Sequence, residues 1–337
     1  MPHASGDSPQ VFRFALLMTV ATPIVLTLMG FLTVALSSAV IAVPMLYLFY
    51  FYDANEWEDQ PIRVIGLVTG VSIALGAISQ NIQDAVLARN PIRSVDSGSL
   101  SLAEVLVSLL VAFATVFIAQ IGPIALTRQP KFDDLIDGLT FGVAAGSAYA
   151  AGESLTTSWK FVGTTGVRTP SNDTFLWVAK VIELGLLRPV IIGASIGLVV
   201  AAFAGVGDGP GKISKPYLRS LITSIAIVAL WQVGVRMIAE LTSGNAEAIT
   251  NLAWGATIAA YLILRIRVVL HVAMIEAANE AIARGTSLRS ANKGIGYCPE
   301  CAMPLRDGAN FCSNCGTSVR AHSRLARTDI TTNRVAK

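Results

Sequence analysis

The chain has 337 residues, of which 53% are hydrophobic and only 14% are charged, and its mean hydropathy is +0.60. A soluble globular domain of this size does not carry so much apolar sequence, so the composition excludes that class and predicts a polytopic membrane protein. The small net charge of +3 gives no indication of nucleic-acid binding. We therefore expect the lipid bilayer as a partner and no nucleic acid.

Along the chain, a polar tail at residues 1–10 precedes the first apolar segment and lacks the basic start and cleavage site of a signal peptide. Residues 11–52 are almost continuously apolar. Because a span needs about 20 residues, they predict two helices with a turn between Gly30 and Ser38. Later apolar segments predict six further spans, at residues 62–78, 103–126, 135–155, 190–205, 217–241 and 248–269. The expected fold is therefore all-α, with about eight transmembrane helices.

Residues 174–187 are predicted to form a separate amphipathic helix at the membrane interface, because Lys180 and Glu183 lie among apolar neighbours. The span that follows begins after Arg188-Pro189, and its GASIG segment gives it a face of small residues.

The distribution of basic residues predicts the orientation of the chain. Arg89, Arg93, Lys160 and Arg168 lie on one side of the eight-span arrangement. The other side holds both termini and these basic residues: Arg63, Arg128, Lys131, Lys212, Lys215, Arg219, Arg265 and Arg267. The positive-inside rule then favours two cytoplasmic termini, and we expect an integral protein of the cell membrane.

The predicted helix at 135–155 carries two notable features. Gly138, Gly142 and Gly146 recur at every fourth position, which places them on one helix face where another membrane helix could approach closely. Near its far end lies Glu153. An ionisable residue at or near the membrane is a candidate for a functional site, and the alternative is an interfacial glutamate that ends the span.

The segment that contains these features resembles the PrsW family of intramembrane metalloproteases, whose pattern reads roughly F-D-x-x-x-D-G-x-x-x-G and continues to F-x-x-x-E-N. The upstream segment YLFYFYDANEWEDQP is similar to the Tyr-Asp…Glu-Pro segment of that family. The resemblance covers about residues 30–260 and implies a PrsW-like membrane domain. The positions that match are Phe132, Asp133, Asp137, Gly138, Gly142 and Glu153, with Tyr149 in place of the aromatic residue and Ser154 in place of Asn.

The resemblance also implies an intramembrane metal site, built from a Glu-Glu pair, the later glutamate and histidines on two spans. Metal-assisted hydrolysis needs about three protein ligands, one position open to water and a base. Here FATVFIAQIG stands where the acidic pair belongs, and Gly193 and Val233 stand where the histidines belong. Glu153 would be catalytic only if the protease interpretation holds. We therefore interpret the domain as a PrsW-like fold without the catalytic set, and enzymatic activity stays an open question.

Without a metal, a buried Glu153 needs a positively charged or hydrogen-bonding neighbour. By residue type, the candidates are Arg236 on the span at 217–241 and Lys160 in the adjoining loop. Two versions stay open: a charge pair between Glu153 and Arg236, and a Glu153 that is hydrated at the interface.

The C-terminal cysteines carry the most specific motif of the chain. All four lie in two C-x-x-C pairs, Cys298 with Cys301 and Cys312 with Cys315. Four thiolates at this spacing can hold a structural zinc ion, whereas two disulfides or a redox dithiol are the alternatives. The segment CPEC…FCSNCG resembles the zinc-ribbon family. The predicted domains are thus a tail at 1–10, the membrane domain at 11–272, a helix extension and linker at 273–296, a zinc ribbon at 297–319 and a disordered basic tail at 320–337.

Three classes of function are compatible with this organisation. The first is a non-catalytic scaffold or regulator, in which the membrane domain holds a transmembrane helix or lipid and the ribbon binds a cytoplasmic protein. The second is an active intramembrane metalloprotease that cleaves membrane proteins. The third is a transporter or channel, which has less support because the sequence shows no inverted repeat and no chain of intramembrane carboxylates.

Overall fold

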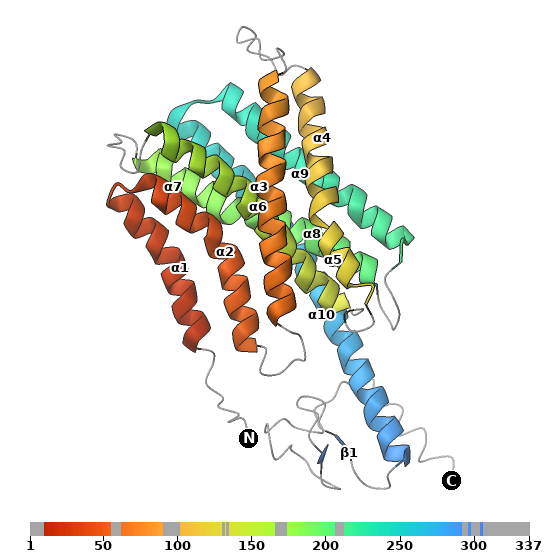
Figure 1. Cartoon of the computed structure of the whole chain (residues 1–337). Coiled ribbons are helices and arrows are strands. Elements are labelled where there is room, and N and C mark those ends of the chain that lie inside the picture. The colour runs from red at the N-terminus through yellow and green to blue at the C-terminus, as the bar shows by residue number, and fades with distance from the viewer. Residues whose placement is uncertain are drawn as a thin grey trace. The chain divides into compact units, whose positions relative to one another are not determined.

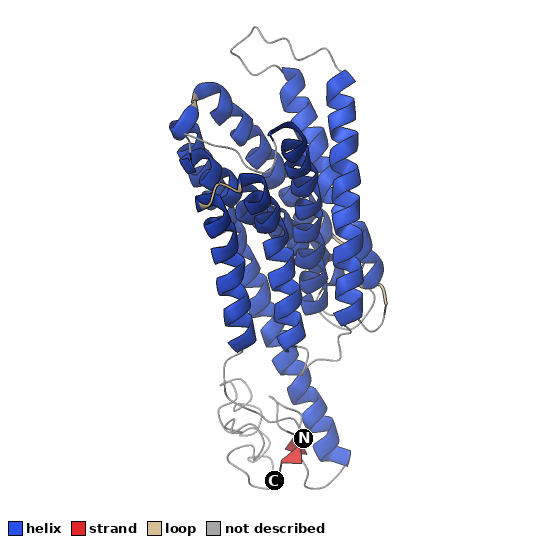
Figure 2. Cartoon of the chain, turned by 60° about the vertical axis from the view of Figure 1, so that its left-hand side comes forward, coloured by secondary structure: helices blue, strands red, loops and turns tan. Residues whose placement is uncertain are grey.

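A computed structural model describes residues 10–54, 62–89, 102–129, 132, 135–165, 174–205, 212–291, 296–297 and 304–305. The chain divides into two compact units, one at Pro9–Leu270 and one formed by Met1–Ser8 with His271–Lys337. We describe each unit by itself. The first is a bundle of helices, as Figures 1 and 2 show.

The helices of the first unit follow the apolar segments of the sequence closely. The last helix, α10, begins in this unit and continues into the second. The elements are α1 (Gln10–Leu28), α2 (Leu32–Ala54), α3 (Ile62–Arg89), α4 (Leu102–Ala119), α5 (Ile121–Leu126), α6 (Leu135–Thr165), α7 (Thr174–Ile182), a π-helical turn η1 (Glu183–Leu187), α8 (Arg188–Ala204), α9 (Lys215–Leu241) and α10 (Gly244–Ala291).

The turn between the first two helices lies at residues 29–31, at the early edge of the predicted interval. Gly30 adopts a φ of 81° there. This left-handed conformation favours glycine, because a Cβ atom would collide with the following carbonyl group. The prediction of two helices within residues 11–52 is confirmed.

Five described helical segments are long and apolar enough to cross a membrane. They are Arg63–Ala85, Val105–Leu126, Phe175–Ala204, Lys215–Leu241 and Gly244–Ala273. Two shorter apolar helices, Leu16–Leu28 and Leu32–Leu46, accompany them. The prediction of a helical domain with several segments able to cross a membrane is therefore confirmed, whereas the number of eight spans stays a prediction.

Helix α6 is not among those five segments, although the sequence analysis expected a span there. Glycine, serine and Glu153 lower its apolar character. It is nevertheless buried along most of its length, with Tyr149 and Glu153 almost inaccessible at 0% and 1% exposure. Helix α6 therefore lies inside the bundle, where it contacts α2, α3 and α8.

The prediction of a separate interfacial helix at 174–187 is wrong. The structure joins α7, η1 and α8 into one helical segment, Phe175–Ala204, most of which is buried. The join is the π-helical turn, in which the backbone N–H of Arg188 bonds to the carbonyl oxygen of Glu183, five residues earlier. A proline cannot donate the next helical hydrogen bond, and a wider turn just before Pro189 lets the helix continue through it.

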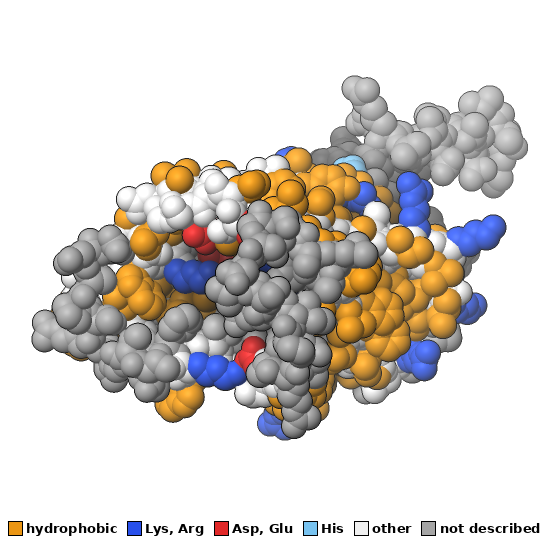
Figure 3. All heavy atoms as spheres, turned by 90° about the horizontal axis from the view of Figure 1, so that it is seen from above, with side chains coloured by type: hydrophobic (Ala, Val, Ile, Leu, Met, Phe, Trp, Pro, Cys, Tyr) orange, Lys and Arg blue, Asp and Glu red, His pale blue; other side chains and the backbone are white. Residues whose placement is uncertain are grey.

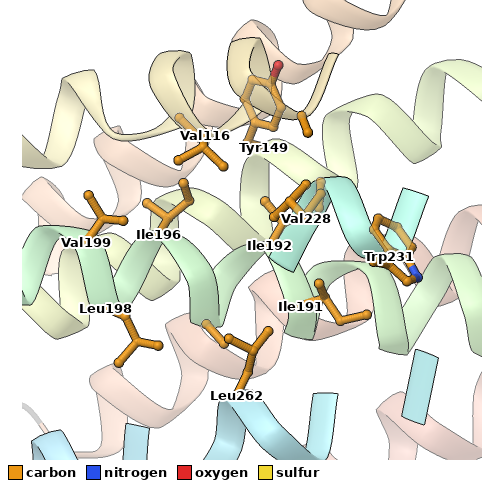
Figure 4. Close-up of a cluster of buried hydrophobic side chains, with 14 of the residues drawn as sticks. Val116, Tyr149, Ile191, Ile192, Ile196, Leu198, Val199, Val228, Trp231 and Leu262 are labelled. Carbon is orange, nitrogen blue, oxygen red and sulfur yellow. The ribbon is translucent and has the colours of Figure 1, made fainter. Parts of the chain in front are cut away.

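The apolar core surrounds α8. Figure 4 shows side chains from five helices pointing toward one another there. The buried set includes Val116 of α4, Tyr149 of α6, Ile192 and Ile196 of α8, Val228 of α9 and Leu262 of α10.

Helices α6 and α8 run antiparallel and meet backbone to backbone. A Cβ atom on Gly142 would lie 2.8 Å from the Cα atom of Gly197, and one on Gly146 would lie 2.9 Å from the Cα atom of Gly193. A Cβ on Gly138 would lie 2.9 Å from the Cβ atom of Ala204. The predicted glycine face is therefore confirmed, and its partner is the predicted small-residue face around GASIG.

In the second unit, the structure describes the end of α10 and a pair of short strands. Strand β1 (Gly296–Tyr297) pairs antiparallel with β2 (Pro304–Leu305), with Gly296 opposite Leu305 and Tyr297 opposite Pro304. Cys298, Cys301, Cys312 and Cys315 lie outside the described residues.

Candidate functional site

The most unusual group of side chains in the bundle surrounds Glu153. This residue lies one turn after Tyr149 on α6, and its side chain is 1% exposed. Its Oε2 atom accepts a hydrogen bond of 2.7 Å from Nη2 of Arg188, the first residue of α8. The side chain of Arg188 is 17% exposed. The site therefore contains a largely buried ion pair that joins α6 to α8.

Helix α3 supplies a second donor to the same carboxylate. Nε2 of Gln83 donates to Oε1 of Glu153 at 3.3 Å and also lies 3.2 Å from Oγ of Ser79. This is possible because α3 and α6 contact each other through glycine. A Cβ on Gly76 would overlap the carbonyl oxygen of Tyr149, and one on Gly152 would overlap that of Ile73. Close backbone packing thus brings the Gln83 side chain of α3 within reach of Glu153.

Several polar atoms around the ion pair have no hydrogen-bond partner among the described residues. They include the hydroxyl groups of Tyr149, Thr115 and Ser154 and the Nε atom of Arg188. The Tyr149 hydroxyl lies near Ser79 and Thr115 as well as near Glu153. An unpaired buried polar group costs about 1–3 kcal/mol, so this cluster is destabilising in a region that is otherwise tightly packed.

Two further ion pairs lie on the helices that surround Glu153, namely α3, α6 and the continuous segment of α7, η1 and α8. Lys160 of α6 pairs with Asp84 of α3, and Nζ of Lys180 on α7 lies 3.0 Å from Oε2 of Glu183 in η1. These pairs are more exposed than the Glu153–Arg188 pair. Figure 3, viewed from the end at the top of Figure 1, shows acidic and basic side chains together in a hollow of that face.

The structure corrects the predicted partner of Glu153. Its cation is Arg188, rather than Arg236, and Lys160 pairs with Asp84. The alternative of a hydrated, interfacial Glu153 is also wrong, because the side chain is almost fully buried. The sequence did contain a signal for Arg188, since this residue is a lone cation between the apolar segments at 174–187 and 189–204. The error came from treating those segments as two elements.

The other residues of the family-like motif lie along α6 or just before it. Phe132 is buried and makes an edge-to-face contact with Phe141, with ring centroids 5.3 Å apart. Asp137 is buried in the first turn of α6, and Gly138 and Gly142 are at the contact with α8. Ser154 is also buried, and Asp133 lies outside the described residues.

Within the described part of the chain, no three His, Cys, Asp or Glu side chains are grouped so that they could hold a metal ion. His271 on α10 is exposed.

Comparison with known proteins identifies one family. Residues 297–319 match the zinc-ribbon domain, and this match includes all four cysteines. No curated protein and no solved structure matches the chain. The chain thus combines membrane-type helices with a zinc-ribbon domain.

Proposed function

We propose that the protein is a PrsW-like integral membrane protein that acts as a non-catalytic scaffold or regulator. In this proposal the membrane domain binds a transmembrane segment or lipid, and the zinc ribbon binds a cytoplasmic protein. Both termini are cytoplasmic and the protein resides in the cell membrane. The observation that carries the proposal is the contact between Glu153 and Arg188.

Glu153 is the carboxylate to which the PrsW resemblance would assign a role in metal chemistry. Its two oxygens accept hydrogen bonds from Arg188 and Gln83. A metal ion at this carboxylate would have to displace Arg188 or remain beside its positive charge, and both are costly in a buried site. The guanidinium group instead supplies the counter-charge that a metal supplies in a protease.

The packing at Gly193 supports the same proposal. The PrsW resemblance would place a histidine at this position, but a Cβ atom there would lie 3.2 Å from the Cβ and backbone N of Ser147 and from the carbonyl oxygen of Val143. Even the Cβ atom of a histidine would therefore require α6 to shift by a few tenths of an ångström, before its ring is accommodated. Glycine at position 193 allows α6 and α8 to pack closely, and a metal-binding side chain there would disturb this packing.

The ribbon supplies a separate site for zinc. Its family match and its two C-x-x-C pairs support a structural ion held by Cys298, Cys301, Cys312 and Cys315. The first pair falls in residues 298–303, which connect the paired strands β1 and β2. Because all four ligands would be cysteines, the ion has no open position for substrate, and its role is to fold the docking domain.

A protease assay combined with metal analysis tests the proposal. The full chain in proteoliposomes would be incubated with labelled transmembrane peptides, alongside Glu153→Gln. We expect no cleavage above the level of this variant. We also expect one zinc per chain, which is lost in Cys298→Ser. Cleavage that disappears in Glu153→Gln, or a second metal retained in Cys298→Ser, would contradict the non-catalytic function.

The docking role requires its own experiment. Cross-linking in intact cells would compare the wild type with Cys298→Ser/Cys301→Ser, in which the ribbon cannot hold zinc. Cys312→Ser serves as an independent variant of the same site. We expect cytoplasmic proteins to be cross-linked to the wild type only. An unchanged set of cross-linked proteins would show that the ribbon does not bind them.

A further inference from the structure

The corner where α5 and α8 end and α9 begins is held together by aromatic and polar contacts. Phe203 in the last turn of α8 packs edge to face on Tyr217 in the first turn of α9, with ring centroids 5.4 Å apart. The Tyr217 hydroxyl lies 3.1 Å from Oε1 of Gln120, at the start of α5. The backbone N–H of Lys212 donates to the carbonyl oxygen of Phe203 at 3.1 Å. The end of α8 and the start of α9, which are neighbours in the sequence, therefore meet α5, which comes much earlier in the chain.

Four exposed cations belong to this corner. Arg128, two residues after α5, places its guanidinium 5.7 Å from the centre of the Phe203 ring. Lys212, Lys215 and Arg219 follow on the segment that leads into α9 and on its first turns. None of them belongs to a salt bridge among the residues that the structure describes. The corner thus presents positive charge that those residues do not neutralise.

The start of α9 adds to this positive potential. Ser214 is the N-cap residue, and its hydroxyl accepts a hydrogen bond of 3.3 Å from the backbone N–H of Tyr217. The N-terminus of a long helix carries a partial positive charge and favours anions nearby. Lys212 and Lys215 flank this N-terminus.

Apolar side chains lie between and beside these cations. Ile213 is 71% exposed, and Leu218 and Ile222 are 46% and 66% exposed. In a membrane helix such side chains contact acyl chains, whereas lysine and arginine reach the headgroups. The alternation of Lys212, Ile213 and Lys215 therefore fits a boundary between headgroups and acyl chains better than it fits open water.

We propose that this corner binds the headgroup of an anionic phospholipid. Its phosphate would lie near Lys212, Lys215 and Arg219 at the N-terminus of α9, and its acyl chains would lie along Leu218 and Ile222. The cation–π contact with Phe203 holds Arg128 at the edge of the same site. The site lies where α5, α8 and α9 meet and does not include Glu153. The proposal requires only that these helices are inserted in a membrane.

Lipid binding to the purified full chain tests this site. The chain would be reconstituted in nanodiscs of phosphatidylcholine with a fluorescent phosphatidylglycerol, and binding would be measured for the wild type, Lys212→Gln, Lys215→Gln and the Lys212→Gln/Lys215→Gln/Arg219→Gln triple variant. Each single change should weaken binding about fivefold, which corresponds to about 1 kcal/mol per basic residue at an anionic surface. Arg265→Gln is the matched control, because this exposed cation contacts Tyr261 on α10 and lies outside the site.

The outcomes separate the lipid site from its alternatives. Glutamine retains most of the aliphatic side chain, and a thermal melt of each variant checks that it is folded. Equal binding by the wild type and the folded triple variant would overturn the proposal. Equal affinity for phosphatidylcholine would also overturn it, because the site would then not select an anionic headgroup. Competition by millimolar inorganic phosphate would assign the site to a free anion instead of a lipid.

Discussion

The two halves of α6 meet their neighbours in opposite ways. From Gly138 to Gly146 the helix places three glycines directly against α8, and the two backbones approach closely there. From Tyr149 to Ser158 it buries polar side chains, and its link to α8 is the ion pair between Glu153 and Arg188. The close contact in the first half leaves no space for a polar or catalytic side chain between α6 and α8. The second half keeps a charge and several unpaired polar atoms inside the bundle.

This difference shows how a bundle can retain a costly polar cluster. Close packing of small residues fixes the distance and orientation of α6 and α8, and that rigidity holds the second half in place although its polar groups are incompletely bonded. A buried polar cluster that does not maximise stability is a common property of functional sites. We call residues 138–146 the glycine half of α6 and residues 149–158 its polar half. We expect both halves to contribute to stability, and the polar half to carry the function.

The largest effect is expected from breaking the polar half. Arg188→Met leaves Glu153 buried without its cation, so the free energy of unfolding should fall by about 3–5 kcal/mol. Unfolding in mixed detergent micelles measures this change. Adding Glu153→Gln should recover most of the loss, because the uncompensated charge is then removed. Lys160→Met, which breaks the exposed pair with Asp84, is the control and should cost about 0–1 kcal/mol.

An intermediate effect is expected from crowding the glycine half. Gly142→Val places side-chain atoms against Gly197, and overpacking of this kind costs about 1–3 kcal/mol. Gly70→Val on α3 is the matched control, since a Cβ atom there has no neighbour within 4 Å. The unfolding midpoints of the two variants should differ clearly. Equal midpoints would show that α6 and α8 can separate without cost.

The smallest expected effect is a gain in stability rather than a loss, and it concerns a single hydroxyl group of the polar half. Tyr149→Phe removes a buried hydroxyl that lies near Ser79 and Thr115 but has no hydrogen bond of acceptable distance and angle to a described residue, so stability should rise by about 1 kcal/mol. In the control Tyr217→Phe, the lost hydroxyl donates to Gln120, and stability should fall by about 0.5–1.5 kcal/mol. A loss of stability in Tyr149→Phe would show that this hydroxyl forms a hydrogen bond when the protein is in the membrane.

The sequence allowed the glycine half to be predicted but only part of the polar half. A four-residue spacing is a local pattern that fixes a helix face, so Gly138, Gly142 and Gly146 identified the contact surface. The partner of Glu153 depends on which of several helices packs beside it, and no local pattern specifies that choice. Arg188 is brought to Glu153 by the antiparallel packing of α6 and α8 and by the π-helical turn, and the sequence analysis ended an element at this turn.

The π-helical turn also constrains the length of the chain at this point. It contains one residue more than an α-helical path would need, and each residue of an α-helix advances the side-chain direction by about 100°. Helix α7 contacts α1 and α2, whereas α8 contacts mainly α6 and α9, so the extra residue sets the rotation of one contact surface relative to the other. Removing one residue from Glu183–Leu187 would rotate one surface away from its neighbours while every remaining side chain stayed chemically the same. Insertions and deletions here are therefore expected to be far less tolerated than substitutions.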